Sequence, residues 1–310
     1  MLRQIHFTTL FSNVSAMVLH AFFAIVFTVA CSVPAHAQRQ GEADARPPGD
    51  EHAKRFHRGL KHLQNLDRHA MAKLEKQLKD VAPEMIDHIV AFGYGDVYAD
   101  ERLDPLSRQV ATIAALTALG NAAPQLRFHI DAALNLGMAS EAIVEVIYIT
   151  TVFAGFPAGL NGVAVLGQAF DARGIKMAPV QPRKGSRRER GLAAVSATSN
   201  ASGQAVLDSL EDVAPDLGTF ILDFAYGDII SRDVISPQWK EITMIAAAAA
   251  RGTMAPQLAV HLHAALNVGC SKAQIAEVIK QMAVYAGFPA ALNAAFEFKR
   301  VLAQRTDTPK

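Results

Sequence analysis

The chain has 310 residues, of which 51% are hydrophobic and 19% are charged, proportions that are ordinary for a protein with a large core. Its formal net charge of +1 excludes the strong positive field with which a protein binds nucleic acid or an anionic surface by charge alone. Apolar residues recur at helical spacing, and alternating apolar and polar runs are scarce, so the sequence predicts helices rather than sheets.

The first segment has the order of a secretory signal. A weakly basic start precedes an apolar stretch over about 14–30, and Ala35-His36-Ala37 places small residues on both sides of a cleavage position. We expect cleavage after Ala37 and export to the periplasm or the exterior. An uncleaved membrane anchor and a lipoprotein modified at Cys31 are the alternatives, although ~17 residues are few for a membrane span.

The segment that follows predicts a disordered stretch to about residue 50 and then a basic helix over 51–79. This helix contains four histidines, whose spacing places no pair at i,i+4, and we therefore expect no metal site there. These histidines are His52, His57, His62 and His69.

An internal repeat is the most informative feature of the sequence. Without any gap, residues 80–170 align with residues 212–302, and roughly 37 of about 91 positions are identical. The longest shared strings are Asp80-Val81-Ala82-Pro83 with Asp212-Val213-Ala214-Pro215, Ala132-Ala133-Leu134-Asn135 with Ala264-Ala265-Leu266-Asn267, and Ala154-Gly155-Phe156-Pro157 with Ala286-Gly287-Phe288-Pro289. The comparison shows which residues each copy retains.

The repeat predicts the domain organisation. The expected parts are a signal peptide over 1–37, a disordered segment and N-terminal helix over 38–79, repeat 1 over 80–170, a linker over 171–205, repeat 2 over 206–303 and a tail over 304–310. The linker prediction rests on its basic, Pro-containing start and its Ser- and Ala-rich end, which are typical of solvated chain.

Start and stop signals predict the helices within each repeat. Asp104-Pro105 and Ser236-Pro237 each pair an N-cap residue with Pro at the first helical position. The helix that begins at Pro237 is expected to end at Gly252, and Ser271 to Gln274 forms a capping-box pattern. The predicted fold is therefore all-α, with a helical bundle repeated twice.

Three ordered strings of the second repeat resemble the signature of the carboxymuconolactone decarboxylase family. They are 256–269 (PQLAVHLHAALNVG), 275–278 (IAEV) and 285–293 (YAGFPAALN), and the first repeat matches them through His129, Glu145, Gly155 and Asn161. The resemblance covers both repeats and implies the all-α fold of the alkylhydroperoxidase D-like proteins. Because single-repeat members assemble as trimers or hexamers, it also implies a homotrimer of this chain that mimics a hexamer of single repeats.

His129 and His261 are the leading catalytic candidates. Each lies in the middle of an apolar helix, both repeats retain it, and the motif histidine of the family falls on this position. A neutral imidazole there can move a proton to or from a carbon acid. The alternative is a core histidine bonded to a backbone carbonyl.

Glu241 precedes His261 by one helix and matches a glutamate that activates the histidine in the peroxidase branch of the family. A carboxylate beside an imidazole raises its basicity and fixes its tautomer. The first repeat has neutral Gln109 there, so the two sites are expected to be unequal, with the second the more active. Alternatively, Glu241 only complements the helix dipole.

Four further residues are candidates for substrate binding. Gln125 and Gln257 lie one turn before the histidines, where the resemblance to the decarboxylases implies a glutamate, so a carboxylate acid or base is missing there. Arg108 and Lys240 keep a positive charge that would suit a lactone carboxylate, or they are solvated helix charges.

The thiol peroxidases of the family use two cysteines spaced by two residues, and this sequence has none at the matching positions. Cys270 follows Gly269 at a helix end, where a small apolar role suits it. Phosphate loops, Ser–His–Asp patterns and zinc spacings are also missing, so we expect a cofactor-independent enzyme. It would act on a small carboxylated lactone or enolisable acid by histidine-mediated proton transfer. The alternatives are an alkylhydroperoxidase-like antioxidant protein and a non-catalytic oligomer that binds small molecules.

Overall fold

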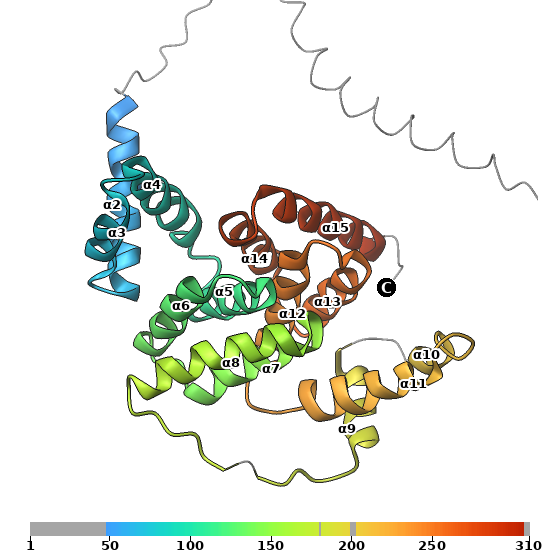
Figure 1. Ribbon diagram of the computed structural model, residues 1–310. Coiled ribbons are helices and arrows are strands. Elements are labelled where there is room, and N and C mark those ends of the chain that lie inside the picture. The colour runs from blue at the N-terminus through green and yellow to red at the C-terminus, as the bar shows by residue number, and fades with distance from the viewer. Residues whose placement is uncertain (1–47, 180, 199–202, 307–310) are drawn as a thin grey trace, which may run out of the picture. The chain divides into compact units, whose positions relative to one another are not determined.

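The computed structural model describes residues 48–179, 181–198 and 203–306. The expected signal peptide and most of the expected tail lie outside these ranges. Within them all regular structure is helical, which confirms the all-α prediction (Figure 1). No helix in these ranges is long and apolar enough to cross a membrane.

The two repeats have the same order of elements. The first contains α2 (Pro48–Leu66), α3 (Ala70–Leu78), α4 (Pro83–Asp87), η1 (His88–Tyr98), α5 (Pro105–Leu119), α6 (Ala123–Asn135), α7 (Ser140–Ala154) and α8 (Phe156–Asp171). The second contains α9 (Arg187–Thr198), α10 (Gly203–Asp208), α11 (Pro215–Phe220), η2 (Ile221–Ile230), α12 (Pro237–Arg251), α13 (Ala255–Asn267), α14 (Lys272–Tyr285) and α15 (Phe288–Thr306). The elements η1 and η2 are π-helices that continue α4 and α11.

The predicted helix ends are confirmed. The Asp104 side chain accepts a hydrogen bond from the Ser107 amide at the start of α5, and Ser236 does the same for Trp239 at the start of α12. Gly252 ends α12 with φ of 71°, and the capping box at Ser271 is formed. These caps satisfy orphan backbone groups locally, which is why short sequence signals located them.

The segment expected to be a linker differs from the prediction. Its second half is helix α9, which packs against η2 as α2 packs against η1. A Cβ on Gly191 would lie 2.0 Å from Leu222 O, and one on Gly59 would lie 1.9 Å from Val90 O, so glycine permits the same close backbone approach in both repeats. The basic residues of α9 are not simply solvated, because Arg190 pairs with Asp228.

The repeats meet along α5 and α12, which pack against each other at the centre of the bundle. Their alanines are buried and allow this close approach, and Trp239 Nε1 donates to Ser107 Oγ across the contact at 2.9 Å. Helix α14 of the second repeat packs on α5, and α7 of the first packs on α12. Each repeat therefore contributes a helix to the surroundings of the other.

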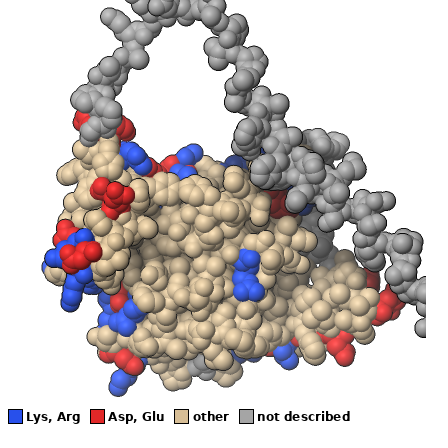
Figure 2. All heavy atoms as spheres, turned by 45° about the horizontal axis from the view of Figure 1, so that its top comes forward, with Lys and Arg blue, Asp and Glu red and all other residues tan. Residues whose placement is uncertain are grey.

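Exposed apolar side chains line α8 and α15. On α8 these are Phe156 and Leu160, and on α15 they are Phe288, Leu292 and Phe296, each more than half exposed. Few charged side chains lie in the centre of the face drawn in Figure 2. Exposed apolar side chains that gather on one helix are typical of protein–protein contact sites.

Candidate functional site

The two candidate histidines occupy equivalent positions in α6 and α13. His129 and His261 are 3% and 7% exposed. Nδ1 of His129 lies 2.8 Å from Gln109 Oε1, and Nδ1 of His261 lies 2.9 Å from Glu241 Oε2. Each histidine is therefore bonded to the residue at the same position of the preceding long helix. This residue is the amide Gln109 in the first repeat and the carboxylate Glu241 in the second.

His129 ends a chain of hydrogen bonds that crosses between the repeats. Its Nε2 lies 3.1 Å from the hydroxyl of Tyr285, which belongs to α14. The Tyr285 hydroxyl lies 2.6 Å from that of Tyr98, which in turn lies 2.7 Å from Thr112 Oγ1. The Gln281 amide nitrogen donates to Thr112 Oγ1 at 2.6 Å.

One end of this chain has a defined donor. Arg108 has only donors and donates to Gln281 Oε1 at 3.1 Å, so the Gln281 amide nitrogen faces Thr112 and donates to its hydroxyl. Beyond Thr112, each hydroxyl and each ring nitrogen of His129 can either donate or accept, and the chain continues through His129 to the side chain of Gln109.

All members of the chain facing His129 are neutral. Burial lowers the pKa of His129 to about 3. Burial raises the pKa of Tyr98 to about 12 and raises that of Tyr285 well above its usual range. His129 is thus neutral at pH 7, and its Nε2 already has the Tyr285 hydroxyl as a hydrogen-bond partner.

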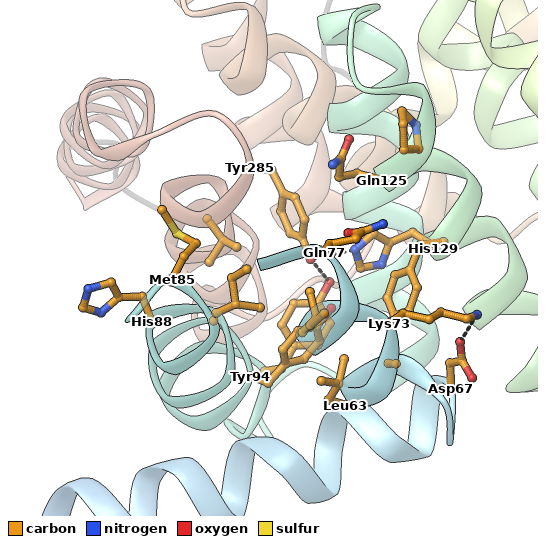
Figure 3. Close-up of a pocket in the computed structure, with 18 of the residues that line it drawn as sticks. Leu63, Asp67, Lys73, Gln77, Met85, His88, Tyr94, Gln125, His129 and Tyr285 are labelled. Carbon is orange, nitrogen blue, oxygen red and sulfur yellow. Dashed lines mark hydrogen bonds and ion pairs between the residues drawn. The ribbon is translucent and has the colours of Figure 1, made fainter. Parts of the chain in front are cut away.

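A cavity of about 640 Å³ opens beside His129 between α2, α3, η1, α6 and α14 (Figure 3). Gln125, which is exposed, lines it one turn before the histidine, while Tyr285 reaches it from the other repeat. Most other lining residues are apolar or aromatic, and Lys73, paired with Asp67, lies at its α2–α3 side. Apolar walls with few polar groups are typical of small-molecule sites.

The site around His261 has no counterpart of the Tyr285 hydroxyl. Phe153, from α7 of the first repeat, stands where Tyr285 stands in the other site and packs its ring edge-on to the imidazole at 5.1 Å. Ile230 and Met244 replace Tyr98 and Thr112. Within the described ranges no protein group bonds His261 Nε2, while Glu241 orients the ring through Nδ1.

The predicted cationic substrate ligands lie elsewhere. Arg108 is 1% exposed, donates to Glu277 Oε2 at 3.1 Å and does not line the cavity beside His129. Its role is structural, because a buried guanidinium requires an acidic partner. Lys240 is half-buried and lines a different cavity from either histidine. Gln257 is exposed one turn before His261.

The remaining candidates for other chemistries are weak. Cys270 is buried, and burial raises the pKa of its thiol to about 11, which disfavours a thiolate nucleophile. Among the described residues no cluster of three or more His, Cys, Asp or Glu has the arrangement of a metal site.

The comparison of the two repeats did not identify the hydrogen-bonded chain that ends at His129. Tyr98, Thr112, Gln281 and Tyr285 are polar in one repeat only, and the comparison looked for residues that both repeats retain. The signal that could have identified them is the difference between the repeats. All four of these polar residues replace an apolar residue of the other repeat, and all four belong to the chain at His129.

Comparison with known proteins agrees with this architecture. The sequence model of the Carboxymuconolactone decarboxylase family matches residues 83–168 and 215–299. The chain is 36% identical over 109 residues to the 4-carboxymuconolactone decarboxylase of Acinetobacter baylyi, which covers 35% of this chain and 80% of that protein. It is 32% identical over 111 residues to an uncharacterized 15.0 kDa protein of Paracoccus denitrificans, covering 36% of this chain and 75% of that protein.

The same fold occurs in a crystal structure from Burkholderia xenovorans, named as a gamma-carboxymuconolactone decarboxylase subunit. It superposes with a TM-score of 0.51 at 22% identity and covers 81% of this chain and 98% of that chain. The shared fold thus extends over both repeats, and the family match covers more than half of the sequence. This protein belongs to the carboxymuconolactone decarboxylase family.

Proposed function

We propose that this protein is a cofactor-independent lyase of the carboxymuconolactone decarboxylase type, acting on a small carboxylated lactone or a related enolisable acid. The observation that carries the proposal is the buried pair of Glu241 and His261, joined at 2.9 Å with Nε2 of the histidine unbonded. The similarity to the decarboxylase of Acinetobacter baylyi supports the substrate class.

In the proposed reaction His261 moves the proton. The Glu241 carboxylate accepts a hydrogen bond from Nδ1 and holds the tautomer in which Nε2 carries a lone pair. It also stabilises the imidazolium that forms when Nε2 takes a proton. The substrate carboxylate leaves as CO2, and the enolate carbon takes from the imidazolium the proton that Nε2 had taken up from water. One proton is consumed for each CO2 released, and the pair returns to its starting state.

The test is decarboxylation of 4-carboxymuconolactone, followed as loss of the lactone and release of CO2. We expect His261→Ala to lower kcat by ~10²–10⁴-fold, the usual contribution of a general acid–base group. Glu241→Gln, which copies the first repeat, should lower it by about tenfold or more because the imidazolium loses its counter-charge. The matched control is His263→Ala on the same helix, whose imidazole contacts Gln304 instead.

Three outcomes contradict parts of the proposal. Loss of turnover in His129→Ala but not in His261→Ala would assign the reaction to the first repeat. Turnover of a hydroperoxide that Cys270→Ser abolishes would favour the antioxidant alternative. No turnover of the lactone by the parent protein would remove this substrate and leave the family membership unchanged.

A binding role is the second candidate, and the site around His129 favours it. That site has a cavity of about 640 Å³, but its imidazole is held by Tyr285 and faces an amide rather than a carboxylate. Saturable heat on titration with the lactone, without turnover, would support a non-catalytic small-molecule site there.

A further inference from the structure

A second cavity, of about 760 Å³, lies between α9, η2 and the start of α12. Neither His129 nor His261 lines it, so it is separate from both candidate reaction sites. Its lining includes four cations and one acid. These are Arg183, Lys184, Arg190, Lys240 and Asp233.

Within the described ranges, Arg190 is the one of these four cations with a carboxylate at ion-pair distance. Arg183 donates to Gly227 O at 3.1 Å, to Asp228 O at 3.0 Å and to Ser231 Oγ at 2.6 Å, all of them neutral acceptors. Lys240 is half-buried, and no hydrogen bond or ion pair holds its ammonium within the described ranges. Burial lowers the pKa of Lys240, and the charges of Asp233, Glu145 and Glu241, none of them at ion-pair distance, offset only part of this shift. The carboxylate that pairs with Arg190 is that of Asp228, at 3.2 Å.

The cavity arises from side-chain differences between the repeats. On α9 the small Ala193 and Ala194 stand where α2 has Lys61 and His62. Burial and the nearby Arg108 guanidinium lower the pKa of His62, which places that ring close to the counterpart of Lys240. Arg108 also forms an ion pair with Glu277, whereas within the described ranges Lys240 has no carboxylate at ion-pair distance.

We propose that this cavity binds a small organic polycarboxylate. Its volume lies within the ~300–1,000 Å³ range of ligand sites and far exceeds the needs of an inorganic oxyanion. Ala197, Ile230 and Val268 give it apolar walls for a carbon skeleton, while Arg183 and Lys240 supply donors for carboxylates. The bound anion would join α9 to η2 and α12.

Isothermal titration of the whole chain with citrate and succinate tests the proposal. We expect one saturable site per chain with Kd of about 0.01–1 mM for at least one of them, and no binding of trimethyl citrate, which lacks the charges. Lys240→Met should weaken binding about tenfold or more, because it removes the unpaired ammonium. Restoring the first-repeat side chains with Ala193→Lys and Ala194→His should abolish binding by filling the space.

Lys299→Met, which removes an exposed cation of α15, is the matched control and should leave binding unchanged. Thermal unfolding of each variant verifies that it is folded, and the titration requires no turnover, so a failure at His261 does not affect it. Equal binding by Lys240→Met, binding of inorganic phosphate alone, or no saturable heat with either carboxylate would overturn the proposal.

Discussion

His129 and His261 have the same place in the same helix, but their partners give them different acid–base character. Gln109 offers His129 a neutral carbonyl, and Tyr285 occupies the other ring nitrogen. Glu241 offers His261 a charge and leaves Nε2 open. One amide-to-carboxylate difference, seen directly in the sequence, thus separates the two sites, while the tyrosine that completes the difference was visible only after folding.

Buried neutral His129 should make stability depend on pH. Its folded pKa of about 3 lies below the ordinary value near 6.5, so the unfolded chain takes up the proton first and stability falls as pH decreases through that window. Between pH 7 and pH 5 the loss from this group should be about 2 kcal/mol. Urea denaturation at several pH values should show a flatter profile for His129→Asn.

His52→Asn, which replaces an exposed histidine of α2, is the control for that measurement. An unchanged pH profile in His129→Asn would show that His129 takes up its proton within the folded state. The assignment of His129 as a buried neutral group would then be wrong.

At the scale of elements, the contact between α9 and η2 depends on glycine. The backbone of η2 approaches Gly191 so closely that any Cβ would lie 2.0 Å from Leu222 O, and carbonyl oxygens of a helix cannot move aside without losing hydrogen bonds. The π-helical winding of η1 and η2 presents these carbonyls to the neighbouring helix in both repeats. Sequence signals for caps do not report such helix–helix distances.

Gly191→Ala should therefore lower the free energy of unfolding by about 1–3 kcal/mol, the usual cost of overpacking. Gly167→Ala is the matched control, because Gly167 lies on an exposed part of α8 with open space around it. There alanine should stabilise by up to about 1 kcal/mol through helix propensity. Chemical denaturation measures both, and equal effects of the two substitutions would contradict the close contact.

At the scale of the whole molecule, the two repeats behave as two subunits joined in one chain. Each contributes a helix to the other, and a buried acid on that helix meets an arginine of the opposite repeat. Glu277 pairs with Arg108 at 3.1 Å, and Glu145 with Arg232 at 2.7 Å. Breaking such a buried pair leaves an uncompensated charge, so these contacts make the repeats mutually dependent.

We propose that three chains assemble through the exposed apolar stripes of α8 and α15. Light scattering coupled to size exclusion should then give the mass of a trimer. Leu160→Glu with Leu292→Glu should reduce it to a monomer, because two buried charges disfavour an apolar interface. Lys76→Glu on α3 is the control for the added charge. A parent protein that is monomeric, or a double variant that is still trimeric, would contradict this assembly.

The sequence by itself determined the all-α class, the duplication, the family resemblance and the caps. These depend on local periodicity, on short-range hydrogen bonds or on identity between copies. A contact between Glu241 and His261 was implied by the family resemblance alone. The tertiary structure decided the rest. Arg108 was expected to bind substrate but forms a buried ion pair with Glu277, and Tyr285 contacts His129 from the other repeat. Such contacts join residues more than 150 positions apart, and no local pattern encodes which helix packs against which.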